Sequence, residues 1–322
     1  MKFIDLHCDT ASLLLETSQH LKENHCKIDI KRLQEGEALA EFFAMFIDSA
    51  KVDSSYDYCV KMLDNFKNEL RLNQKSIMLC RNHDELMLSQ KEGKIGAFLT
   101  IEEGEAIEGD IEKLRYFKEQ GISLITLTWN HENALGYSNF EWRDQDRGLK
   151  KKGFEVVEEM NHLGMLIDVS HLSDAGFNDV ISNSTSPIIA THSNSRTMTH
   201  NPRNLSDKML KQLADKGGIT GVNFFNKFLV EGEIEEQKET STIKDMIRHI
   251  RHIRNIAGIE VIGLGSDFDG IPNPVEIEDI SQMSKLSDAL LSQALFSHGF
   301  SSDEVERIFY KNSLRIIKDV LK

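Results

Sequence analysis

Residues 2–10 read Lys2-Phe3-Ile4-Asp5-Leu6-His7-Cys8-Asp9-Thr10, a short apolar run that ends on a histidine and an aspartate two positions apart. Side chains at positions i and i+2 of a strand point the same way, so His7 and Asp9 could hold one metal ion at a strand end. An ordinary turn with a hydrogen-bonded histidine would give the same letters. The metal hypothesis therefore needs further ligands elsewhere in the chain.

Apolar runs of this kind recur along the chain and alternate with longer amphipathic stretches, a pattern typical of βα units around a parallel sheet. The runs lie at 3–6, 38–47, 95–100, 123–128, 165–169, 187–191, 219–225 and 261–265. The helices expected between them lie at 11–23, 56–74, 110–120, 153–163, 174–183, 206–216 and 242–257. Two more helices are expected after the last run, at 279–296 and 302–320.

This order of elements favours an α/β fold, a closed TIM (β/α)8 barrel with extra C-terminal helices. A doubly wound open sheet is the alternative. It would normally carry a glycine-rich phosphate loop after its first strand, where this chain has Leu6-His7-Cys8-Asp9. No Pro, Gly or Ser-rich linker divides the 322 residues. We therefore expect one (β/α)8 domain over residues 1–322, with two smaller domains as the alternative.

Charge and cysteine content exclude several classes of partner. The 38 Lys and Arg against 52 Asp and Glu give a net charge of −14, which repels nucleic acid and anionic lipid surfaces. The 4 cysteines form no CxxC motif, and no signal peptide or membrane-spanning run is visible. We expect a reduced, cytoplasmic protein that binds neither nucleic acid nor membranes.

Polar residues with metal-binding or acid–base chemistry follow most of the predicted strands. In a (β/α)8 barrel the carboxyl ends of the strands meet at one rim, so these residues should converge there. Imidazoles and carboxylates without a thiolate have the composition of a zinc site. We expect the remaining histidines to be structural or surface residues. The strand-end residues are His7 and Asp9; Glu102 and Glu103; Trp129, Asn130 and His131; His171; His192; and Asp267 and Asp269.

The strand-end motifs, taken together and in order, resemble one family over nearly the whole chain. They are similar to the membrane, or renal-type, dipeptidases, which form peptidase family M19 within the amidohydrolase superfamily. Relatives in that superfamily tend to begin with His-x-His, whereas this chain has His-x-Asp. The motifs are residues 4–10, Ile101-Glu102-Glu103-Gly104, residues 167–171, Thr191-His192-Ser193, Pro202-Arg203-Asn204-Leu205 and residues 265–270.

The resemblance implies a TIM barrel with two Zn²⁺ ions that hydrolyses dipeptides by a metal-bridging hydroxide, and it allows a C-terminal D-amino acid and a homodimer. By motif, His7 and Asp9 would hold the more buried zinc ion, and Glu102 would bridge the two ions. His171 and His192 would hold the second ion. Asp267 would act as general base and then general acid.

The resemblance also assigns substrate-binding residues. Arg203 would pair with the free carboxylate of the dipeptide, with Asn204 as further support. The chain departs from the family where Trp129 replaces a histidine that helps to hold the substrate carbonyl, and His131, two residues on, could reach the same space. Glu103 stands where the family usually has a glycine. It would be either an exposed neighbour of the site or a residue that changes local backbone freedom or substrate access.

Two other functions remain open from the sequence. An amidohydrolase acting on N-acyl amino acids or lactam amides would need the same metal ligands and a similar grip on a carboxylate. A catalytically silent binding protein could keep the barrel, although the full ligand set and Asp267 speak against it.

Overall fold

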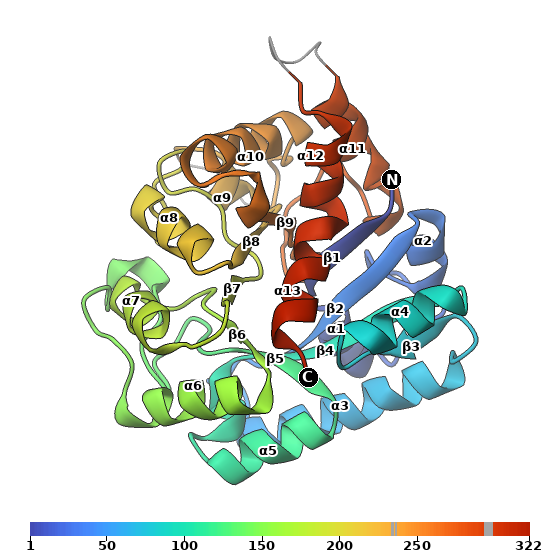
Figure 1. Cartoon of the computed structure of the whole chain (residues 1–322). Helices are drawn as coiled ribbons and strands as arrows, with labels where there is room; N and C mark the ends of the chain where they lie inside the picture. The colour runs from blue at the N-terminus through green and yellow to red at the C-terminus, as the bar shows by residue number, and fades with distance from the viewer. Residues whose placement is uncertain (233–234, 236, 293–298) are drawn as a thin grey trace.

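The computed structural model describes the chain apart from residues 233–234, 236 and 293–298 (Figure 1). All eight predicted strands are present, and a short ninth strand, β3, was not predicted. The strands are β1 (Phe3–Cys8), β2 (Ala38–Phe46), β3 (Ile77–Leu79), β4 (Ile95–Glu102), β5 (Ile122–Thr126), β6 (Leu166–Asp168), β7 (Ile189–Ala190), β8 (Ile219–Val222) and β9 (Ile262–Leu264).

The strands form a closed parallel barrel. Neighbouring strands run in the order β2-β1-β9-β8-β7-β6-β5-β4, and pairing of β2 with β4 completes the ring. Ala40 pairs with Gly96 and Phe46 with Glu102 in that closing register. β3 pairs only with the start of β4, outside the ring of eight. The predicted TIM barrel is confirmed, and the open doubly wound sheet is excluded.

Helices surround the barrel, and most lie where the amphipathic stretches predicted them (Figure 1). The helix predicted at 11–23 is shorter, because Ser18 adopts a left-handed conformation with φ 54°. α2, α4 and α9 were not predicted. The helices are α1 (Thr10–Thr17), α2 (Ile30–Glu35), α3 (Ser55–Leu72), α4 (His83–Lys91), α5 (Ile111–Glu119), α6 (Lys151–Leu163), α7 (Asp174–Asn183), α8 (Asp207–Asp215), α9 (Asn226–Leu229), α10 (Ile243–Ala257), α11 (Ser284–Leu291), α12 (Ser302–Glu306) and α13 (Asn312–Val320).

The extra C-terminal helices are confirmed as α11, α12 and α13. The predicted stretch 279–296 becomes a short turn and then α11, and its residues 293–296 lie outside the described residues. α12 runs into α13 through one π-helical turn, Arg307–Lys311. In Figure 1 α13 crosses the front of the barrel.

The lumen of the barrel is filled by a separate apolar cluster that α13 completes. Seven barrel strands contribute buried side chains to this cluster, and Ile316, Ile317 and Val320 of α13 pack against them. The apolar cluster and α13 close one end of the barrel to substrate, so the accessible site lies at the opposite rim. The strand residues are Ile4, Leu6, Leu39, Ala40, Phe42, Phe98, Leu124, Leu166, Ile189 and Ile219.

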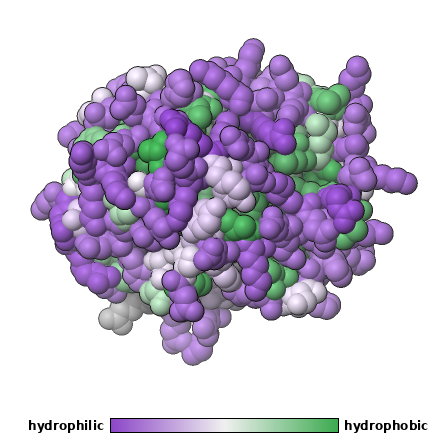
Figure 2. Space-filling model, turned by 90° about the horizontal axis from the view of Figure 1, so that it is seen from below, coloured by the Kyte–Doolittle hydropathy of each residue, from purple (hydrophilic) through white to green (hydrophobic). Residues whose placement is uncertain are grey.

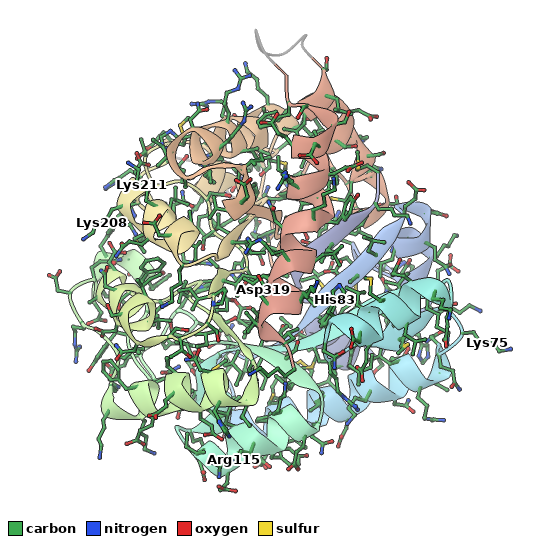
Figure 3. All side chains as sticks on the ribbon, in the orientation of Figure 1. Lys75, His83, Arg115, Lys208, Lys211 and Asp319 are labelled. Atoms are coloured by element: carbon green, nitrogen blue, oxygen red, sulfur yellow. The ribbon has the colours of Figure 1, made fainter. Side chains whose placement is uncertain are left out.

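Polar and charged side chains cover much of the surface seen in Figures 2 and 3. Figure 2 shows one face that is mostly hydrophilic, with small apolar patches. In Figure 3 charged side chains such as Arg115 of α5 and Lys208 and Lys211 of α8 point outward. Within the described part of the chain, no helix is both long and apolar enough to span a bilayer.

Candidate metal centre

The predicted strand-end residues converge at one rim of the barrel, in the floor of a cavity of about 900 Å³. Asp9 follows β1, Glu102 ends β4, and Asp267 follows β9, and all three line the cavity. His171 lines it as well, after β6. The convergence follows from the parallel barrel, because the carboxyl ends of all its strands meet at the same rim.

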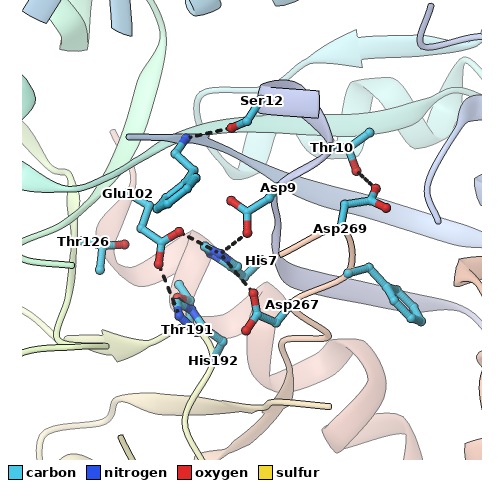
Figure 4. Close-up of polar contacts among 12 residues, drawn as sticks. His7, Asp9, Thr10, Ser12, Glu102, Thr126, Thr191, His192, Asp267 and Asp269 are labelled. Carbon is cyan, nitrogen blue, oxygen red and sulfur yellow. Dashed lines mark hydrogen bonds and ion pairs between the residues drawn. The ribbon is translucent and has the colours of Figure 1, made fainter. Parts of the chain in front are cut away.

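Glu102 lies between two groups of side chains and presents one carboxylate oxygen to each (Figure 4). Its Oε2 is 3.4 Å from His7 Nε2, and its Oε1 is 3.1 Å from His171 Nε2 and 3.4 Å from His192 Nε2. Ligands of one tetrahedral zinc ion, at about 2.0–2.1 Å from it, lie roughly 3.3 Å apart. The spacing therefore suits a cation on each side of Glu102.

On the His7 side two more carboxylates approach the same nitrogen. Asp9 Oδ2 is 3.7 Å and Asp267 Oδ1 is 3.8 Å from His7 Nε2. On the other side, the Nε2 atoms of His171 and His192 lie 3.0 Å apart. All these side chains are buried or nearly so.

Burial and mutual charge set the protonation of the cluster. Burial lowers the pKa of His171 to about 3 and that of His192 well below its usual value, so both imidazoles are neutral, the form that binds metals. Burial opposes protonation of His7, but the carboxylates of Glu102 and Asp9 outweigh it and raise its pKa. The carboxylates therefore draw positive charge into the space around His7.

The donor set fits the metal ions that the resemblance implies. Among the described residues, His7 Nε2 and Asp9 Oδ1 are buried and have no hydrogen-bond partner. Buried polar atoms normally find a partner, so two without one, on side chains that each offer a ligand atom within 4.8 Å of the other, indicate a ligand there. Imidazole nitrogens and carboxylate oxygens are the donors that zinc accepts.

Strained and tightly packed backbone holds these side chains together. His171 and Asp267 adopt left-handed conformations with φ 65° and 60°, which are uncommon for residues other than glycine and concentrate at functional sites. A Cβ atom on Gly265 would lie 1.8 Å from the carbonyl oxygen of Thr191. Glycine at that position lets the chain after β9 approach the chain after β7, and Asp267 and His192 follow directly on these two segments.

A relay of hydrogen bonds fixes the orientation of His192. The Thr191 hydroxyl lies 2.6 Å from Asp168 Oδ2 and 2.8 Å from His192 Nδ1. Because the carboxylate can only accept, the hydroxyl donates to Asp168 and accepts from Nδ1–H, which leaves the lone pair of Nε2 facing Glu102. Asn130 Oδ1, 3.1 Å from His171 Nδ1, can orient that ring in the same way.

Replacing Thr191 with valine is expected to weaken metal binding at this half of the centre by about 10–100-fold, as loss of an outer-shell partner commonly does. Valine keeps the shape but cannot accept from His192 Nδ1. Competition with a chromogenic chelator would measure the affinity. Thr128→Val is the control, because the buried Thr128 hydroxyl has no hydrogen-bond partner among the described residues. Equal affinities in the two variants would contradict the relay.

Asp267 is held by Asn223, a residue for which no role was predicted. Asn223 Nδ2 donates to Asp267 Oδ2 over 2.8 Å, which leaves Oδ1 facing His7. Burial raises the pKa of Asp267 to about 7, with the charge of His7 opposing and those of Asp9 and Glu102 adding to the effect. A carboxyl group with such a pKa can both accept and release a proton near neutral pH.

Arg203 lines the cavity with most of its hydrogen-bonding capacity unused. The side chain is buried, and within the described residues its Nε and Nη1 have no partner. Its Nη2 is 3.5 Å from the carbonyl oxygen of His192, and its guanidinium lies 5.3 Å from the ring of Phe228. Burial lowers its pKa to about 10, so it is charged at neutral pH. An anionic group in the cavity would satisfy it.

Two substrate-binding candidates lie less directly on the cavity. Trp129 and Asn130 form the wall, and His131 beside them has its Nε2 3.4 Å from Asp48 Oδ1 and is partly exposed. Asn204 is buried, and its amide nitrogen donates to the carbonyl oxygens of Thr199 and Phe228. Contact of either residue with substrate stays a prediction, and the bonds of Asn204 indicate that it supports the loop carrying Arg203.

Glu103 is buried, so the interpretation as an exposed neighbour was wrong. Its φ of 100° is one that favours glycine, which explains the glycine usual at this position. The carboxylate accepts hydrogen bonds from Asn133 Nδ2 at 2.5 Å and from the backbone N–H of Trp129 at 3.2 Å. It therefore ties the end of β4 to the loop that forms the cavity wall.

A further buried carboxylate, Glu41 on β2, lies beside Asp5 of β1 in the sheet register. Neither of its oxygens has a hydrogen-bond partner among the described residues. Burial, aided by the charge of Asp5, raises the pKa of Glu41 well above its usual value. The folded protein therefore keeps a proton that the unfolded chain releases above pH about 4.3.

We expect Glu41→Gln to stabilise the metal-free protein at neutral and alkaline pH. A proton bound only in the folded state makes stability fall by about 1.4 kcal/mol per pH unit between the unfolded and folded pKa values. Glutamine removes this slope because it does not ionise. Urea unfolding of chelator-treated protein between pH 5 and 8 would measure it, and parallel pH profiles for both proteins would disprove the assignment.

A closed parallel barrel with imidazoles and carboxylates paired around a rim cavity is an arrangement that can hold metal ions and support metal-assisted hydrolysis. The family model for membrane dipeptidase, peptidase family M19, matches residues 1–322. The chain therefore belongs to this family of metallopeptidases that act on dipeptides, and the resemblance seen in the sequence motifs is confirmed.

Individual relatives agree with this assignment. An uncharacterised dipeptidase of Schizosaccharomyces pombe is 29% identical, over 98% of this chain and 80% of its own length. The solved structure of dipeptidase AC, a metallopeptidase of family M19, has a TM-score of 0.90 at 25% identity, covering 100% of this chain and 99% of that one. A Rhodobacter sphaeroides metallopeptidase, liganded with a phosphinate mimic of the dipeptide L-Ala-D-Ala, shares the fold with a TM-score of 0.87 at 24% identity, covering 99% of each chain.

Proposed function

We propose that the protein is a zinc-dependent dipeptidase that holds two Zn²⁺ ions. The observation that carries the proposal is the position of Glu102, whose two oxygens face separate groups of ligands in the floor of the cavity. His7 and Asp9 would hold one ion and His171 and His192 the other, with Glu102 shared. When bound, the ions would lower the pKa of water from 15.7 to about 7 and polarise the scissile carbonyl.

Asp267 is the proposed general base and acid. Its Oδ1 faces the cluster while Asn223 holds Oδ2, so one oxygen is available to take the proton from the attacking water. The same carboxyl group then gives that proton to the nitrogen of the departing amino acid, because the peptide C–N bond breaks only as its amine is protonated.

Arg203 is the proposed anchor for the free carboxylate of the dipeptide. A guanidinium can grip a carboxylate through two parallel hydrogen bonds, one of them from Nη2 and the other from Nε or Nη1. Nε and Nη1 of Arg203 are without partners among the described residues, and Nη2 makes one bond of 3.5 Å, to the carbonyl oxygen of His192, so its second N–H can complete such a pair. A charged anchor close to the metal ligands limits how much peptide can extend beyond the scissile bond. This restriction supports a dipeptidase over an enzyme for long peptides.

The cavity, at about 900 Å³, is near the upper end of the range of about 300–1,000 Å³ usual for small-molecule sites. Such room supports tolerance of a C-terminal D-amino acid, and it would also admit an N-acyl amino acid. We place the enzyme in the cytoplasm, a proposal that its four free cysteines support.

Hydrolysis of a stereochemically varied dipeptide library by zinc-loaded protein tests the proposal, with N-acyl amino acids in the same panel and a chelator-treated control. We expect release of free amino acids from dipeptides that stops on chelation and returns with zinc. Faster turnover of N-acyl amino acids would favour the wider amidohydrolase activity. No turnover of any member would favour a binding protein, and activity that survives complete metal removal would overturn the mechanism.

A further inference from the structure

Trp142 stands at the mouth of the cavity in a conformation that the backbone does not favour. It lines the cavity and is 38% exposed. Trp142 and the preceding Glu141 both adopt positive φ, 62° and 53°. A left-handed conformation is strained for residues other than glycine, and such strain persists only where the surroundings enforce it.

Two side chains from the loop after β7 hold the indole in place. The ring of His200 stacks on Trp142 with 4.8 Å between ring centroids and 20° between planes. The guanidinium of Arg196 lies 5.0 Å from the indole centroid, within cation–π range. Arg196 is itself fixed by two hydrogen bonds to Asp174, of 2.6 and 2.8 Å. The indole is therefore held in a fixed orientation and forms one wall of the cavity.

The same loop carries Arg203, so the wall formed by Trp142 lies on the side of the proposed carboxylate anchor. His200, Pro202 and Arg203 all line the cavity, and Arg196 Nε donates to the carbonyl oxygen of Asn204 over 2.9 Å. Near this anchor Phe225 and Phe228 form a second aromatic wall, with 4.8 Å between their centroids. The side chain of the substrate residue that bears the free carboxylate would meet these apolar surfaces.

We propose that Trp142 is a specificity-determining residue and that the enzyme prefers dipeptides with a large apolar or aromatic side chain on the C-terminal residue. The inference rests on the proposed dipeptidase function and on the role of Arg203 within it. An indole held rigid before substrate arrives loses little conformational entropy on contact, so its surface contributes fully to binding. His200 is a positioning residue for that indole, and sequence reasoning had grouped it with structural or surface histidines.

Kinetics of Trp142→Ala on Ala-Phe, Ala-Leu and Ala-Gly test the proposal, with Phe-Ala and Leu-Ala as the reversed pairs. We expect kcat/KM for Ala-Phe and Ala-Leu to fall about tenfold, mainly through KM, as for loss of one wall of an apolar pocket. Ala-Gly should change less than about twofold. Trp142→Leu should recover most of the loss. Phe154→Ala is the matched control, since Phe154 is 37% exposed and lies on the outer helix α6.

His200→Ala should lower the same two activities by a smaller factor, and the double variant should be no worse than Trp142→Ala alone, because both changes remove one contact surface. An equal loss on every dipeptide would mean a general structural role and overturn the proposal. A loss confined to Phe-Ala and Leu-Ala would overturn the placement at the C-terminal residue.

Binding separates failure of this inference from failure of the proposed function. Calorimetric titration of N-acetyl-phenylalanine and N-acetylglycine into the wild type and Trp142→Ala requires no turnover. If the wild type cleaves no dipeptide, the dipeptidase function fails, yet weaker binding of N-acetyl-phenylalanine alone by the variant still supports the apolar subsite. Unchanged binding of both ligands would overturn the subsite whether or not dipeptides are cleaved.

Discussion

Replacing Asp267 with asparagine is expected to lower kcat for dipeptide hydrolysis by about 10²–10⁴-fold, the usual contribution of a positioned general acid–base group. Asparagine cannot take a proton from water at neutral pH or return one to the departing amine. The change should act on kcat more than on KM, since Asp267 is proposed to act during bond cleavage and Arg203 to bind the substrate.

The fold and the metal content should survive this substitution. Asparagine has nearly the same shape and tolerates the left-handed backbone that Asp267 adopts, with φ 60°. Its side-chain oxygen can still accept the hydrogen bond from Asn223 Nδ2. Steady-state kinetics and metal analysis by atomic emission, made on the same preparations, would separate a chemical defect from a folding or metal defect.

Asp269→Asn is the matched control, because Asp269 lies two residues further on, also lines the cavity and has φ 71°. Its oxygens accept hydrogen bonds from the Thr10 hydroxyl at 2.6 Å and the Lys27 backbone N–H at 2.7 Å. We therefore expect a loss of stability and a kcat within a few-fold of wild type. If Asp267→Asn kept more than a tenth of the wild-type kcat, Asp267 would have no part in proton transfer.

The barrel was predictable because parallel strands enclosed by helices are buried on both faces and read as continuous apolar runs. β3 escaped prediction because a run of three residues, Ile77–Leu79, is too short to distinguish from a loop. α4 carried a readable signal that was missed, since the Asn82 side chain caps the helix by accepting from Glu85 N–H. No comparable sequence signal predicts that α1 ends at Ser18.

The side chains of the candidate centre were predictable for a related reason. Their residue types are rare at strand ends by chance, and the barrel alone brings strand ends together. The residues that orient them were not predictable, because Asp168, Thr191 and Asn223 act through hydrogen bonds between strands that are distant in sequence. The conformations of Trp142 and Glu103 were not predictable either, because the residue type does not reveal a positive φ.

Removing the carboxylate of Glu102, which we propose is shared by two ions, is expected to have the second large effect. On that proposal Glu102→Ala takes one ligand from each half of the centre, whereas Glu102→Gln leaves a single neutral oxygen that can face only one half. Burial alone would raise the pKa of Glu102, but the charge of His7 holds it well below its usual value. Both variants therefore remove a full negative charge from the space between the two groups of ligands.

We expect the metal content to fall from two ions per chain in the wild type to one in Glu102→Gln and to less than one in Glu102→Ala. Losing a direct ligand should cost more affinity than the about 10–100-fold typical of an outer-shell partner. Equilibrium dialysis at fixed free zinc, followed by metal analysis, measures the content. Activity should fall at least about 10³-fold in both variants, because activation of water and polarisation of the carbonyl both depend on the ions.

Glu16→Gln is the control for loss of a carboxylate, since Glu16 also lines the cavity but is not among the groups around Glu102. It should retain two ions and nearly full activity. The graded order, alanine below glutamine below wild type, is the informative result, because a carboxylate serving one ion would give one ion in both variants. Two ions per chain in Glu102→Gln at the same free zinc would show that Glu102 is not shared, and the two groups of ligands would then have to hold their ions independently.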